Sequence, residues 1–100
     1  MADLRSKLAE PGILIMDGAT GTQLQKMGLP AGKSPELWNL ENPEAVKKHY
    51  RAYLEAGADA ILTNTFGGSR PRLDMEGSGH LTHDINLAAA KLAREVAGDD

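Results

Sequence analysis

Two short stretches carry the side chains whose types and positions could do chemistry. Asp17–Thr20 follows the apolar run Ile13–Met16, and Asn64–Phe66 follows the run Ala60–Thr63. Neither run alternates apolar with polar residues, a pattern typical of strands that are buried on both faces of a parallel sheet. Ligands of parallel α/β proteins bind at the carboxyl ends of such strands. We therefore predict that the two stretches meet in one binding site.

The first stretch has two other interpretations. Residues 17–22 could be a phosphate-binding loop, but they lack the lysine of a Walker motif and the glycine spacing of a dinucleotide fingerprint. They could also form a tight turn whose Asp17 only caps the next helix. The hydroxyl of Thr20 or Thr22 is predicted to cap that helix by accepting from its first free N–H groups. A second polar cluster after the second run favours a binding site.

Helices must position both stretches. Asn42-Pro43-Glu44 combines a capping residue, a proline at the first helical position and an early acid, and so predicts a helix start. Its apolar stripe contains Val46, Tyr50, Tyr53 and Leu54, whereas the last helix has Ile85, Ala89, Leu92 and Val96. The predicted helices cover residues 2–10, 23–27, 43–56 and 82–97, with a helical turn near 69–76 and a long connection over 29–41.

Strands that alternate with helices predict an α/β fold with a parallel sheet. Two strands cannot make such a sheet stable, because both faces and both edges need cover. We therefore interpret residues 1–100 as the N-terminal quarter of a (β/α)8 TIM barrel, an incomplete single domain, rather than an independent 100-residue fold. A homo-oligomer that completes the sheet is an open alternative.

Composition narrows the class of protein. The chain is 41% hydrophobic and 25% charged, with a net charge of −3 and both signs interspersed. This balance is that of a globular protein and predicts neither a nucleic-acid nor a membrane partner. No apolar stretch resembles a signal peptide, so the cytoplasm is the expected location. Cysteine is absent, so these residues cannot build a thiolate metal site.

The histidines and the single tryptophan are weaker candidates. His80 and His83 have a spacing that a metal ion could use, but no carboxylate pattern accompanies them, and His49 is predicted to be structural. Trp38 lies in the connection over residues 29–41. It could anchor the core or cover a ligand.

Five motifs, in order, resemble the N-terminal part of the homocysteine S-methyltransferase family. These are residues 17–22 (DGATGT), 35–39 (PELWN), 42–44 (NPE), 56–59 (AGAD) and 63–67 (TNTFG). The family includes betaine–homocysteine methyltransferases and the homocysteine-binding module of cobalamin-dependent methionine synthase. Met27-Gly28-Leu29 followed by Pro35–Asn39 is more similar to the bacterial betaine-type enzymes.

The resemblance implies a transferase of methionine biosynthesis, a TIM barrel that moves a methyl group onto the zinc-activated thiol of homocysteine. Asp17 would face the substrate ammonium group, and the backbone N–H groups that follow it would face the carboxylate. Trp38 would cover a betaine-like methyl donor. The implied substrate-binding residues are Asp17, Gly18, Ala19, Thr20, Trp38, Asn64, Thr65 and Phe66.

Two features limit what these residues can do alone. The zinc ligands of the family are cysteines on later strands, so the 100-residue segment is expected to hold part of the pocket and to be inactive by itself. Animal betaine-type enzymes have a tyrosine where this chain has Gly67. The alternatives are a folate- or cobalamin-dependent methionine synthase module and a non-catalytic binding fragment. A different barrel enzyme, such as an aldolase, would need a lysine or a carboxylate pair at the strand ends.

Overall fold

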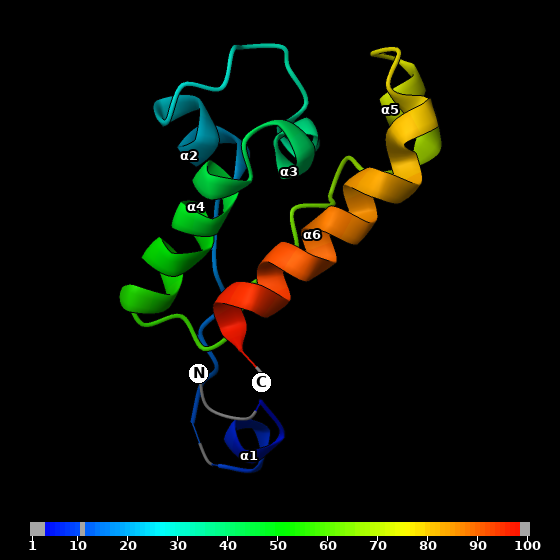
Figure 1. Ribbon diagram of the computed structural model, residues 1–100. Coiled ribbons are helices and arrows are strands. Elements are labelled where there is room, and N and C mark those ends of the chain that lie inside the picture. The colour runs from blue at the N-terminus through cyan, green and yellow to red at the C-terminus, as the bar shows by residue number, and fades with distance from the viewer. Residues whose placement is uncertain (1–3, 11, 99–100) are drawn as a thin grey trace.

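The computed structural model describes residues 4–10 and 12–98, which form a mostly helical structure about 45 × 26 × 20 Å in extent (Figure 1). No helix within these ranges is long and apolar enough to cross a lipid bilayer. The elements in chain order are α1 (Leu4–Ala9), α2 (Gly21–Lys26), η1 (Pro35–Leu37), α3 (Trp38–Glu41), α4 (Pro43–Glu55), α5 (Arg70–Asp74), η2 (Gly79–Leu81) and α6 (Thr82–Ala97).

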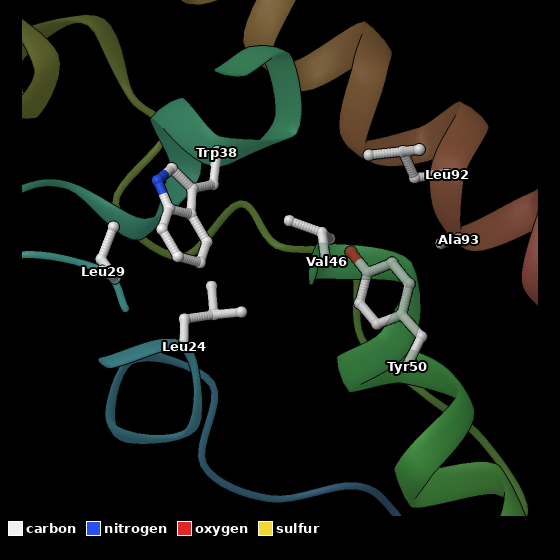
Figure 2. Close-up of a cluster of buried hydrophobic side chains, with 7 residues drawn as sticks. All are labelled: Leu24, Leu29, Trp38, Val46, Tyr50, Leu92 and Ala93. Atoms are coloured by element: carbon white, nitrogen blue, oxygen red, sulfur yellow. The ribbon is translucent and has the colours of Figure 1, made fainter. Parts of the chain in front are cut away.

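The hydrophobic core lies where α2, α3, α4 and α6 meet (Figures 1 and 2). Val46 and Tyr50 of the predicted α4 stripe are buried at i, i+4 spacing. In the α6 stripe Ile85, Ala89 and Leu92 are buried at helical spacing. These residues confirm that each predicted apolar stripe faces the core. The buried residues of this cluster are Leu24, Leu29, Trp38, Val46, Tyr50, Leu92 and Ala93.

Local signals set the ends of the two long helices. Asn42 caps α4, because its Oδ1 accepts from the N–H of Ala45 at 3.4 Å and Pro43 fills the first helical position. Gly98 ends α6 with a φ of +79°, a conformation that glycine adopts at little cost. Both predicted boundaries are confirmed.

Three local predictions need correction or fall outside the description. The long connection predicted over residues 29–41 contains η1 and α3, because Pro35 presets the φ angle that a helical turn requires. Thr20 stands at the start of α2 with φ −108° and ψ −55°, and its side chain does not cap the helix. The first helix is present from Leu4, whereas residues 2–3 and 11 of that prediction lie outside the described residues.

The two predicted strands are not formed as strands in the described residues. Their segments lie side by side in parallel, joined at the Met16–Ala60 bridge. The N–H of Asp17 donates to the carbonyl of Ala60 at 3.1 Å, and the N–H of Asp59 donates to that of Ile15 at 2.6 Å. The two segments therefore lie next to each other as predicted, but their backbone pairing is limited to the residues around the Met16–Ala60 bridge.

The predicted burial of these segments on both faces is also wrong. Ile13 is 90% exposed, and Ile15, Met16 and Leu62 are exposed as well. A strand of a parallel sheet is buried only when further strands pair with its edges and helices cover its faces. In the described residues the two segments pair with each other only at the Met16–Ala60 bridge, and Ile61 packs against the helical core. The other side chains named above have no such cover and face solvent.

This exposure leads to a prediction about the segment on its own. We expect residues 1–100 to lack a cooperative unfolding transition as a monomer, because two unpaired edges and a row of exposed apolar side chains leave too little buried surface. Circular dichroism during urea titration, at several protein concentrations, tests this expectation. A cooperative transition with a midpoint independent of concentration would contradict it.

Candidate functional site

The two candidate stretches meet in a cleft of about 620 Å³. Five of the predicted site residues line this inter-loop cleft, namely Gly18, Thr20, Asn64, Thr65 and Phe66. The remaining described lining residues are Gly21, Ser34, Pro35, Glu36, Leu62, Thr63, Gly67 and Arg72. The structure thus brings together segments that are more than forty residues apart, as the sequence predicted from their places after the two apolar runs.

Asp17 lies beside the cleft and connects its two sides. Its Oδ2 accepts from the backbone N–H of Leu62 at 3.0 Å, whereas its Oδ1 is buried without a hydrogen-bond partner. A buried carboxylate oxygen is costly unless a donor reaches it, and a charged donor offsets that cost best. This oxygen is therefore the group in the site that most needs a donor.

Two rings of α4, those of His49 and Tyr53, lie near the turn over residues 17–19. Burial lowers the pKa of His49, and the negative charge of Asp17 opposes this only in part, so His49 is neutral at pH 7. Its Nε2 is also buried without a partner, and its ring meets that of Tyr53 edge-on at 5.2 Å. The hydroxyl of Tyr53 donates to the carbonyl of Ala19 at 3.2 Å. The α4 rings thus support the 17–19 turn, and the predicted structural place of His49 is confirmed by its burial.

Asn64 is a buried junction at the other side of the cleft. Its side-chain Nδ2 donates to the carbonyl of Pro35 at 2.9 Å and to Oδ1 of Asn39 at 3.0 Å. Its backbone N–H donates to the hydroxyl oxygen of Tyr50 at 2.7 Å. Burial raises the pKa of Tyr50, so the phenol stays protonated at neutral pH. Through these hydrogen bonds Asn64 holds the loop that begins at residue 64 against η1, α3 and α4.

The next two residues are oriented toward solvent and the cleft. The hydroxyls of Thr65 and Thr63 lie 2.8 Å apart, and Phe66 is fully exposed at the rim. An exposed aromatic ring beside polar hydroxyls is able to contact both the apolar and the polar part of a small ligand.

Three predicted site residues, Asp17, Ala19 and Trp38, do not line the cleft among the described residues. Ala19 contributes its carbonyl to Tyr53. Trp38 is 7% exposed and packs in the core beside Leu24 and Leu29 (Figure 2). Of the two interpretations left open for Trp38, its surroundings match those of a core anchor.

Sequence reasoning missed Glu36 and Asn39 as residues of the site. Glu36 is 5% exposed and lines the cleft, and Asn39 donates to the carbonyls of Asn64 at 2.9 Å and Ile85 at 3.2 Å. Both belong to the motif over residues 35–39 that carried part of the family resemblance. Their place in that motif, within two residues of its tryptophan, was the available signal.

His80 in η2 and His83 at the start of α6 are both exposed. No group of three or more histidine, aspartate or glutamate side chains in the described ranges is placed to hold a metal ion. We expect residues 1–100 to bind zinc no more tightly than an unstructured peptide with the same histidines. Isothermal titration with zinc tests this, with the His80→Ala/His83→Ala variant as the matched control. Stoichiometric sub-micromolar binding that the variant loses would contradict the expectation.

The cleft and both segments that form it lie within residues 14–100, and over this range the sequence matches the family described as Homocysteine S-methyltransferase. The chain belongs to this family. The match begins at the first apolar run, so it leaves out α1 and contains every residue that lines the cleft.

Two proteins that this chain is similar to are methionine synthases of mycobacteria. The protein from Mycobacterium tuberculosis (strain ATCC 25618 / H37Rv) is 33% identical over 93 residues, which cover 87% of this chain and 8% of the relative. That from Mycobacterium leprae (strain TN) is 33% identical over 103 residues, which cover 97% of this chain and 8% of the relative. The chain therefore spans about 8% of the length of the relatives it matches.

Proposed function

We propose that this chain forms part of the homocysteine-binding cleft of an enzyme that methylates the homocysteine thiol to give methionine. The observation that carries the proposal is that the family match covers residues 14–100 and the cleft between residues 18–21 and 62–67 lies inside it. The exposed apolar side chains of the two predicted strand segments support the related proposal that the fold is the first quarter of a (β/α)8 barrel.

The roles of the residues follow from what each can offer a small amino acid. The unpartnered Oδ1 of Asp17 suits the substrate ammonium group, because a charge-assisted hydrogen bond would satisfy it. Thr65 and Thr20 offer hydroxyls at the cleft, and Phe66 offers an apolar surface. Holding the thiol and the methyl donor in line is the main way in which such a pocket speeds an in-line displacement.

Zinc does not fit the described residues. The sequence has no cysteine, and these residues contain no group of three histidine, aspartate or glutamate side chains placed around one point. We therefore assign to this chain the binding and orientation of substrate, and we place the zinc ligands expected for the family outside this segment.

The methyl donor divides the proposal into two versions. The order of Met27-Gly28-Leu29 and the 35–39 motif favours a betaine-like donor. The names of the two mycobacterial relatives favour a methionine synthase module instead. In both versions the homocysteine thiol accepts the methyl group, and only the methyl donor differs.

A methyl-transfer assay on the native polypeptide that contains residues 1–100 tests the proposal. Homocysteine is supplied with betaine, with a methylated folate or with methylcobalamin, and methionine is measured. Product from any one donor supports the proposal and identifies the version. The absence of methionine with all donors, together with the absence of homocysteine binding by calorimetry, would reject it.

A further inference from the structure

Glu36 joins the two sides of the inter-loop cleft. Its Oε2 accepts from the hydroxyl of Ser34 at 2.7 Å, and its Oε1 accepts from the backbone N–H of Gly67 at 2.5 Å, across 31 residues of sequence. It is the one carboxylate among the described side chains that line the cleft, and it is 5% exposed. A carboxylate so buried is stable only because donors reach both of its oxygens.

Gly67 is fitted to that carboxylate. A Cβ at this position would lie 2.8 Å from Oε1 of Glu36 and 3.3 Å from its Cδ, so the carboxylate would have to move away from its present place. Gly67 is not among the glycines with a positive φ, so its backbone conformation alone would accept alanine. An alanine here would therefore disturb the Glu36 carboxylate rather than strain the backbone.

The position of Phe66 depends on its neighbours in the chain. Its own ring is fully exposed, so packing of the ring does not hold it. The contacts that fix the backbone on either side come from Asn64, which bonds to Asn39 and Pro35, and from Gly67, which bonds to Glu36. At the same end Asn86 donates from Nδ2 to the carbonyl of Gly68 at 2.8 Å, so loss of the Glu36 contact would remove one of the two side-chain contacts there, the one nearer to Phe66.

We propose that Glu36 is a positioning residue, which holds Thr65–Gly67 in place and thereby sets the affinity of the cleft for its amino-acid substrate. The identity of that substrate rests on the proposed function, whereas the hold on the loop rests on the contacts alone. Glu36 acts through the Gly67 amide, so hydrogen-bond acceptance matters and negative charge does not.

Hydrogen–deuterium exchange of the native polypeptide tests the hold on the loop without any substrate. Glu36→Ala removes both hydrogen bonds and is expected to speed exchange over residues 65–68 about ten- to a hundred-fold. Glu36→Gln keeps an acceptor for Gly67 and is expected to stay within about threefold of the wild type. Glu41→Ala is the matched control, since Glu41 pairs with Lys33 at the exposed surface. Unchanged exchange in Glu36→Ala would overturn the proposal.

Steady-state kinetics test the effect on affinity. We expect Glu36→Ala to raise KM for homocysteine about tenfold with kcat within about threefold, and Glu36→Gln to restore KM. A raised KM in both variants would overturn the proposal, because charge rather than the Gly67 hydrogen bond would be acting. Faster exchange with an unchanged KM would overturn it too. If the polypeptide methylates nothing, the proposed function fails, and the exchange experiment still decides whether Glu36 holds the loop.

A double-mutant cycle tests whether Glu36 and Gly67 are fitted to each other. Gly67→Ala is expected to lower Tm clearly in the wild type and much less in the Glu36→Ala background, where the opposing carboxylate is gone. Equal losses of Tm in the two backgrounds would show that the two residues are independent, which the proposal does not allow.

Discussion

The replacement of Asp17 by asparagine is expected to lower kcat/KM for homocysteine about 30- to 1,000-fold in the native polypeptide. The variant keeps an acceptor for the N–H of Leu62 but loses the negative charge, so a substrate ammonium group would lose its charge-assisted contact with Asp17. Loss of such a charge-assisted contact costs about 2–4 kcal/mol of transition-state binding. Steady-state kinetics with varied homocysteine measure the loss.

The competing role for Asp17 is structural, because its Oδ2 connects the two apolar segments through Leu62. That role predicts a lower Tm and a nearly normal kcat/KM. Asp59→Asn is the matched control, since Asp59 accepts from the backbone N–H of Ile15 at 2.9 Å in a similar connection, and Asp59 does not line the cleft. If Asp17→Asn and Asp59→Asn lower Tm alike and both leave kcat/KM unchanged, Asp17 is not a substrate contact.

The sequence predicted the helices well where their signals are local. The cap at Asn42 and the proline after it lie within a single helical turn, and the buried stripes of α4 and α6 repeat along one helix. Such signals depend on neighbouring residues, so they do not require knowledge of the rest of the fold.

The two predicted strands depend on partners elsewhere, and there the prediction of strand and of burial failed. Ile13 to Met16 has the composition of a buried strand, but a strand forms only against another strand, and the contact made here is the bridge to Ala60. The pattern identified which segments lie together. The pattern could not show which other parts of a protein would cover these segments.

The site was predicted in the same partial way. The cleft residues next to the apolar runs were found from their position, whereas Glu36 was missed because its partner Gly67 lies 31 residues away. A long-range hydrogen bond to a backbone amide leaves no spacing or periodicity in the sequence. The signal that the sequence did offer was the position of Glu36 in the 35–39 motif of the family resemblance.

Trp38→Ala is expected to lower the free energy of unfolding of the native polypeptide by about 3–5 kcal/mol, because a large buried aromatic side chain leaves a cavity that the core cannot fill. Leu24→Ala, at a fully buried neighbour in the same cluster, is expected to cost about 2–5 kcal/mol and is the matched control (Figure 2). Denaturant titration followed by circular dichroism measures both losses.

The kinetics of Trp38→Phe then separate a core anchor from a wall of the donor site. Phenylalanine keeps an aromatic ring in the core beside Leu24 and Leu29, so a core role predicts a modest loss of stability and an unchanged KM for the methyl donor. A wall that faces an onium donor predicts the reverse, since indole is the better partner for a cation and each such contact contributes about 0.5–2 kcal/mol. The position of Trp38 in the core favours the first result. A donor KM that rises severalfold in Trp38→Phe, with stability unchanged and with no such rise in Leu24→Ala, would contradict the core role.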